Sequence, residues 1–160
     1  MTELRQRIQD VIQNEPVAVF MKGTPQFVMC GNSDRALRAL RDAGAPVTGV
    51  DVLADPAIRQ ELSEISGWPT IPQIFVKGEL IGGADITEEL GASGELARVL
   101  EEKLGADYRE SAGERTVGVA AHDELGRSFH EHGDGLVLDD VLDSLAQLGH
   151  SLPFVLIRSS

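Results

Sequence analysis

The sequence has little cysteine, little lysine and no long hydrophobic run. Its 160 residues include one cysteine, Cys30, so neither an internal disulfide nor a metal site built from four cysteines of one chain can form. A Cys-x-x-Cys redox pair is also excluded, because the residue three positions after Cys30 is Ser33. Any redox turnover at Cys30 would therefore need a thiol from outside the chain.

Positive charge is scarce as well. The chain carries 14 Lys and Arg against 26 Asp and Glu, a formal net charge of −12. So acidic a surface disfavours nucleic acid and anionic membranes, and we expect neither as a partner. No apolar run approaches the roughly 20 residues of a membrane span, and the first residues lack the basic stretch and apolar core of a signal peptide. We therefore expect a cytoplasmic protein whose thiol stays reduced.

The composition divides the chain into two parts. Residues 1–104 hold 10 basic and 16 acidic residues, whereas residues 105–160 hold 4 arginines, 10 acidic residues, all four histidines and no lysine. This change predicts a first domain over residues 1–105 and a C-terminal extension over residues 106–160. In the extension we expect a polar link from Asp107 to Arg115, a strand from Thr116 to Ala121, a helix around 141–148 and a strand from Pro153 to Ile157, together a small α/β appendage.

The extension carries all four histidines of the chain. Its histidines lack an accompanying cysteine, and we interpret them as solvated side chains rather than as a metal site: His122, His130, His132 and His150. One hypothesis is that the extension packs on the first domain through its apolar side chains, Val141, Leu142, Leu145, Phe154 and Leu156.

The first domain alternates between helical and extended patterns. Apolar residues at helical spacing predict helices near 4–12, 36–43, 56–65 and 96–104, and a further helix begins near 85. The continuous apolar run from Val17 to Met21 predicts a strand buried on both faces, followed by a loop over 22–33, a strand over 47–52 and a hairpin over 73–81. This order predicts an α/β fold in which a mixed sheet is flanked by helices.

Cys30 is the first candidate for chemistry. It follows the buried strand and precedes a helix, and a helix N-terminus favours a thiolate over a thiol. Lys22, one of three lysines in the chain, lies at the end of the same strand and would add positive charge. The alternative interpretation is a buried, unreactive cysteine with an unrelated surface lysine.

Two further segments are candidates for ligand binding. The rigid turn from Trp68 to Pro72 leads into a strand, and a cis bond before Pro72 would present the backbone of Ile71 to a peptide-like ligand. Gly82-Gly83 precedes Ala84 and Asp85 at a helix start, where backbone N–H groups can bind a carboxylate. Taken singly, each segment also fits an ordinary turn.

Together these motifs resemble one family. The matching text is Met21-Lys22-Gly23-Thr24-Pro25, Cys30-Gly31-Asn32-Ser33, Trp68-Pro69-Thr70-Ile71-Pro72-Gln73 and Gly78-Glu79-Leu80-Ile81-Gly82-Gly83-Ala84-Asp85-Ile86. Over about residues 1–104 the sequence resembles the monothiol glutaredoxins of the CGFS type. The resemblance implies a thioredoxin-like fold, with a mixed four-stranded sheet flanked by helices, that binds glutathione.

The resemblance also implies roles for individual residues. Cys30 would be both the reactive thiol and a metal ligand: two copies of Cys30 and the thiolates of two glutathiones would hold a 2Fe–2S cluster between the subunits of a homodimer. Around the glutathione, Lys22 and Arg59 would contact the glycine carboxylate, Ile71 the cysteinyl backbone, and Ala84 and Asp85 the γ-glutamyl end. The implied function is transfer of the cluster to apo-proteins in iron–sulfur biogenesis, with a BolA-type protein as a further partner.

Two departures from the family pattern stand beside this expectation. Asn32 replaces a phenylalanine next to the cysteine, which would admit more water to a cluster, and Ala84 replaces a second cysteine found in many members. The alternative function is a glutathione-dependent thiol–disulfide oxidoreductase that removes glutathione from mixed disulfides with Cys30 as nucleophile. A Cys-x-x-Ser motif permits this reaction, because a second glutathione can resolve the intermediate.

Overall fold

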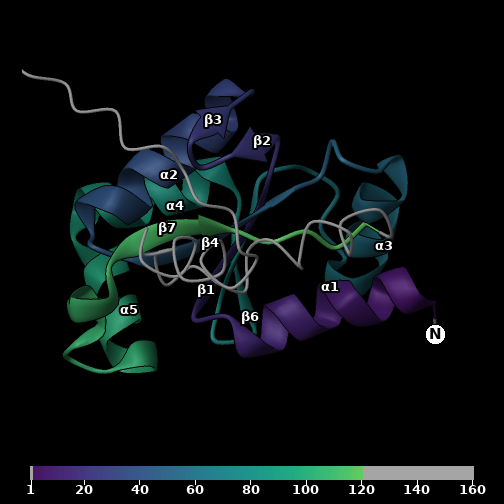
Figure 1. Ribbon diagram of the computed structural model, residues 1–160. Helices are drawn as coiled ribbons and strands as arrows, with labels where there is room; N and C mark the ends of the chain where they lie inside the picture. The colour runs from purple at the N-terminus through teal and green to yellow at the C-terminus, as the bar shows by residue number, and fades with distance from the viewer. Residues whose placement is uncertain (1, 121–160) are drawn as a thin grey trace, which may run out of the picture. The chain divides into compact units, whose positions relative to one another are not determined.

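The computed structural model describes residues 2–120. Five strands form its main sheet in the order β6-β5-β1-β4-β7, and their bounds are β1 Val17–Met21, β4 Pro46–Asp51, β5 Gln73–Val76, β6 Glu79–Gly82 and β7 Gly113–Thr116. Strand β1 runs parallel to β4 and antiparallel to β5, and β5 pairs antiparallel with β6 (Figure 1). The predicted mixed sheet and α/β class are confirmed. All five residues of β1 are buried, as its apolar run predicts.

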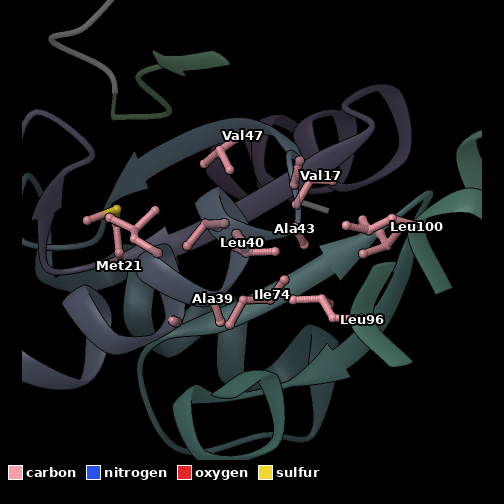
Figure 2. Packing of buried hydrophobic residues seen from close by; sticks show 14 of the residues in the cluster. Val17, Met21, Ala39, Leu40, Ala43, Val47, Ile74, Leu96 and Leu100 are labelled. Carbon is pink, nitrogen blue, oxygen red and sulfur yellow. The ribbon is translucent and has the colours of Figure 1, made fainter. Parts of the chain in front are cut away.

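Helices cover both faces of this sheet. Alternate residues of β1 point to opposite faces, so Ala18 and Phe20 belong to one buried cluster with α1 (Glu3–Asn14) and α3 (Pro56–Ser66). Val17, Val19 and Met21 belong to the other cluster, shared with α2 (Gly31–Asp42), α4 (Ala84–Ser93) and α5 (Glu95–Leu104) (Figures 1 and 2). The two clusters make β1 the centre of the domain.

Capping residues mark the ends of the helices. Thr2 caps α1, because its side chain accepts a hydrogen bond from the backbone N–H of Arg5. Asp55 caps α3 in the same way, accepting from the N–H of Ala57 at 2.9 Å, with Pro56 at the first helical position. Helix α3 ends at Gly67, which adopts the left-handed conformation at φ 69°. The Gly67 cap fixes where the turn from Trp68 to Pro72 begins.

Two segments differ from their predictions. The loop expected over 22–33 contains a short hairpin of β2 (Gly23–Thr24) and β3 (Phe27–Val28). The polar link expected over 107–115 instead contains a 3-10 turn, η1 (Tyr108–Ser111), and β7, which pairs in parallel with β4 as a fifth strand. The strand expected over 116–121 is thus displaced toward the N-terminus. Polar composition concealed β7, because an edge strand exposes most of its side chains.

Residues 106–120 contribute to both buried clusters. Tyr108 is 3% exposed and packs beside α2, while Val119 and Ala120 are almost fully buried beside α1. Arg7 of α1 donates hydrogen bonds to the carbonyls of Val119 and Ala120, at 3.4 and 3.0 Å. The start of the segment that we assigned to an extension is therefore part of the folded domain.

The remaining predictions for the extension lie outside the described residues. They comprise the helix around 141–148, the strand from 153 to 157, the four histidines and the apolar packing residues. Within residues 2–120, no helix combines the length and apolar character needed to cross a membrane.

Candidate functional site

Cys30 occupies the N-cap position of α2, directly after the β2–β3 hairpin. Its backbone is extended, with φ −150° and ψ 132°, and its carbonyl accepts the first hydrogen bond of the helix from Asp34 at 3.0 Å. The residue is half-buried and its thiol is free. The sequence-based placement of this cysteine at a helix start is confirmed, and the thiol sits where the unpaired N–H groups of the first turn gather.

The surroundings of Cys30 lower the pKa of its thiol. The largest cause is the backbone N–H of Ser33, and partial burial opposes it; the N–H of Asn32, the charge of Lys22 and the Ser33 hydroxyl add smaller lowering effects. All of the lowering groups stabilise negative charge on sulfur. The site therefore favours the thiolate, the form that attacks disulfides and binds metals.

Hydrogen bonds hold Lys22 close to the start of α2. The backbone N–H of Lys22 donates to the hydroxyl of Ser33 at 3.2 Å, and its carbonyl accepts from the N–H of Met29 at 3.0 Å. The chain can turn here because Gly23 adopts φ 89°, where a Cβ would lie 2.3 Å from the carbonyl oxygen of Phe27. The β2–β3 hairpin thus brings Lys22 and Cys30 together at one site.

A cavity of about 360 Å³ lies beside this site, within the range of roughly 300–1,000 Å³ usual for small-molecule pockets. The turn before β5, the start of α4 and the first turn of α2 line it, through Asn32, Trp68, Thr70, Ile71, Pro72, Gly83, Ala84, Asp85 and Ile86. The peptide bond between Ile71 and Pro72 is cis, as the sequence suggested. Larger hollows occur elsewhere in the described domain; Cys30 lines none of them, nor this cavity, which reaches toward it through Asn32.

Packing is close around Gly83, which lines the cavity. A Cβ at Gly83 would lie 3.3 Å from the carbonyl oxygen of Pro72 and 3.5 Å from Nε1 of Trp68. The side chain of Gln73 holds the same turn by donating from Nε2 to the carbonyl of Trp68 at 2.7 Å. The indole N–H of Trp68 is buried without a hydrogen-bond partner among the residues that the structure describes. A polar ligand or a water molecule could satisfy it.

The structure brings some of the predicted site residues together. Ile71, Ala84 and Asp85 line the cavity, and Lys22 lies beside Cys30. Arg59 is exposed in the first turn of α3 and does not line the cavity. The assignment of these five residues to glutathione stays a prediction.

Sequence reasoning missed Arg35. Its guanidinium, on α2, donates to two carboxylates of α4, Asp85 at 2.9 Å and Glu88 at 2.6 Å. It also donates to Asn32 on its own helix at 3.3 Å. The acidic partners lie 50 and 53 residues further along the chain. No local pattern signals such a pairing, since i,i+4 spacing describes neighbours on one helix only.

The surface near Cys30 is apolar. Phe27 and Met29 are 71% and 59% exposed in the hairpin that precedes the cysteine. Over residues 2–120, no group of three or more His, Cys, Asp or Glu side chains could hold a metal ion.

A mixed α/β sheet of this order, a thiolate at a helix N-terminus and a cis-proline turn define a thiol protein of the thioredoxin-like fold. Residues 17–81 match the glutaredoxin family model. The sequence is 46% identical over 104 residues to the mitochondrial monothiol glutaredoxin-5 of Saccharomyces cerevisiae, which covers 63% of this chain and 69% of the yeast protein. The chain belongs to the monothiol glutaredoxin family.

Solved structures agree with this membership. The reduced apo form of poplar GrxS14 is 40% identical, with a TM-score of 0.58, and the match covers 63% of this chain and 93% of the poplar chain. A buckwheat glutaredoxin solved as a glutathione complex is 27% identical, with a TM-score of 0.56, over 64% of this chain and 91% of the buckwheat chain. The thioredoxin-like fold expected from the sequence is thus confirmed.

Proposed function

We propose that this protein binds glutathione and, as a homodimer, holds a 2Fe–2S cluster that it transfers to apo-proteins. The observation that carries the proposal is the position of one half-buried thiol, Cys30, whose pKa is lowered by its surroundings and whose near neighbour Asn32 lines a cavity of small-molecule size. A 2Fe–2S cluster takes four sulfur ligands. Because the chain has one cysteine, two chains with two bound glutathiones supply that number.

The cavity residues suit a peptide with charged ends. Asp85, at the start of α4, would accept the ammonium group of the γ-glutamyl end, and the first N–H groups of α4 would bind its carboxylate together with Ala84. The cis turn would align the backbone of Ile71 with the cysteinyl residue. Lys22, beside Cys30, and Arg59 would bind the glycine carboxylate. The complex solved for the buckwheat relative supports glutathione as the ligand.

The exposed hairpin supports the partner side of the proposal. Phe27 and Met29 place apolar surface next to the thiolate, where a second subunit or a recipient apo-protein would exclude water from the cluster. In a mixed complex, a BolA-type protein would bind at the same exposed surface beside Cys30. The cluster is cargo in this scheme, so both its binding and its release must occur at an accessible thiolate.

Anaerobic reconstitution with iron, sulfide and glutathione tests the proposal. We expect a coloured dimer by visible absorption and native mass spectrometry, and no colour in Cys30→Ser or when glutathione is omitted. Transfer is then measured by incubation with an apo-ferredoxin, whose spectrum should appear as that of the dimer disappears. A colourless monomer under these conditions would contradict the proposal.

The lowered pKa of Cys30 also favours a second function, reduction of glutathione mixed disulfides. The Cys30 thiolate would attack the glutathione sulfur of the mixed disulfide, forming a disulfide between Cys30 and glutathione and releasing the thiolate of the substrate protein. A second glutathione thiolate would then attack the glutathione sulfur of this intermediate, which releases oxidised glutathione and regenerates the Cys30 thiolate. Brisk turnover by a protein that binds no cluster would favour this function over cluster transfer.

A further inference from the structure

We propose that Arg35 is a specificity-determining residue for the amino-acid end of the ligand: it binds the α-carboxylate together with the first N–H groups of α4, while Asp85 binds the ammonium group on the same carbon. The inference rests on the proposed binding of glutathione. Its basis is the hydrogen-bonded group of Asn32, Arg35, Asp85 and Glu88, which we call the arginine bridge. Two of its members, Asn32 and Asp85, line the cavity.

The geometry of the arginine bridge fixes a positive charge beside two residues that line the cavity, although Arg35 and Glu88 themselves line a separate hollow. Nη2 of Arg35 lies 2.9 Å from Oδ1 of Asp85, and Nε lies 2.6 Å from Oε2 of Glu88. Nη1 lies 3.3 Å from Oδ1 of Asn32. Since the acceptors belong to two different helices, α2 and α4, three hydrogen bonds fix the planar guanidinium between them while it stays partly exposed.

Donor counting leaves capacity for a ligand. A guanidinium has five N–H donors, and the three hydrogen bonds within the described domain use one donor each on Nε, Nη1 and Nη2. One N–H on each terminal nitrogen remains. Two donors in a planar fork match the two oxygens of a carboxylate.

Charge favours a zwitterion over an amine or an acid. The arginine bridge contains one positive and two negative side chains, so it attracts an ammonium group and repels a carboxylate that is not aimed at Arg35. The γ-glutamyl end of glutathione carries both charges on one carbon atom. Asp85 is 89% exposed and Arg35 is 41% exposed, so both groups are accessible to such a ligand from solvent.

Asn32 has a defined role in this arrangement. It stands where the CGFS-type pattern of the resemblance has a phenylalanine, it lines the cavity, and its side-chain oxygen accepts a hydrogen bond from Nη1 of Arg35. A phenylalanine at position 32 could not accept this hydrogen bond. The departure at Asn32 and the presence of Arg35 therefore form one structural unit.

The test compares three ligands with the full-length chain. Reduced glutathione carries both charges, 4-aminobutanoyl-cysteinylglycine lacks the α-carboxylate, and glutaryl-cysteinylglycine lacks the amine. Trp68 is the only tryptophan of the chain and lines the cavity, so its fluorescence reports binding, with calorimetry as a second measurement.

We expect Arg35→Ala to weaken glutathione binding by about three- to tenfold, the range of one partly exposed charge-assisted contact. The same variant should bind the ligand without the α-carboxylate as well as the wild type does, or better, since two carboxylates then face the ammonium group. Arg35→Lys should restore part of the preference, because the charge remains and the planar fork does not.

Arg38→Ala is the matched control. Arg38 lies on the same helix, is 71% exposed and pairs with Asp34 instead of a cavity residue, so its loss should leave all three affinities unchanged. Suppose that the wild type binds glutathione, but that Arg35→Ala changes the affinity for glutathione and for 4-aminobutanoyl-cysteinylglycine equally. The proposed role of Arg35 is then overturned, and glutathione binding stands. If the wild type binds no glutathione, both proposals fail.

Discussion

The hydroxyl of Tyr108 donates a 2.7 Å hydrogen bond to the backbone carbonyl of Ala43, the residue that ends α2. The two residues lie 65 positions apart, and Tyr108 is 3% exposed. The bond satisfies a carbonyl that a helix C-terminus otherwise leaves open. It ties the segment after α5 to the same helix that carries Cys30 at its other end.

Tyr108→Phe should therefore destabilise the domain. The change keeps the ring and leaves the Ala43 carbonyl without its partner, so we expect a loss of about 1–2 kcal/mol in the free energy of unfolding. Urea denaturation followed by circular dichroism measures it. Glu110→Ala, an exposed change in the same turn, serves as control and should stay within about 0.5 kcal/mol of the wild type. Equal stability of Tyr108→Phe and wild type would show that this hydrogen bond contributes nothing to folding.

The pH dependence of Cys30 alkylation follows from its pKa. The backbone N–H of Ser33 is the main cause of the lowered pKa, so the thiolate forms at lower pH than in an ordinary cysteine. The rate of reaction with iodoacetamide should rise with pH and reach half its maximum at a lower pH than for a cysteine-containing reference peptide. A midpoint at or above that of a cysteine-containing reference peptide would contradict the assignment.

Lys22→Gln should move this midpoint upward, because the charge of Lys22 stabilises the thiolate. Lys77→Gln is the control. Lys77 follows β5 at the end of the sheet where Val17 pairs with Val76, opposite the end that leads to Cys30. Its loss should leave the alkylation profile unchanged.

The predicted carboxylate contacts give a third test. Lys22→Ala and Arg59→Ala should each weaken glutathione binding about fivefold, or about 1 kcal/mol, since an exposed charge-assisted contact is partly screened by solvent. Binding is measured by calorimetry at fixed ionic strength. Arg98→Ala, an exposed change on α5, is the control. Unchanged affinity in Arg59→Ala would remove that residue from the site, and the same holds separately for Lys22.

Asn32→Phe tests the effect of the altered motif on the cluster. Asn32 is exposed two residues after Cys30, and an apolar ring there would keep water from a bound cluster. In air, we expect the coloured dimer of this variant to lose its visible absorption at about half the rate of the wild type or less. A shorter lifetime than that of the wild type would mean that the amide at position 32 stabilises the cluster.

Much of the domain and part of the site could be predicted from the sequence by itself. The apolar run of β1, the cap residues Thr2 and Asp55, and the placement of Cys30 at a helix start all depend on residues a few positions apart. The cis bond at Pro72 belongs to the same class of local signal. Such features depend on backbone sterics and on interactions between residues close together in the chain, so they can be predicted from the sequence alone.

Tertiary structure decided the features whose partners are distant in the chain. Strand β7 is polar and short, and it becomes a strand because the edge of β4 offers unpaired N–H and C=O groups to it. Arg35 looks like one more surface arginine until α2 packs on α4 and brings Asp85 to within 2.9 Å. In both cases the deciding interaction spans about 50 residues or more, and only the packed domain brings the two partners together.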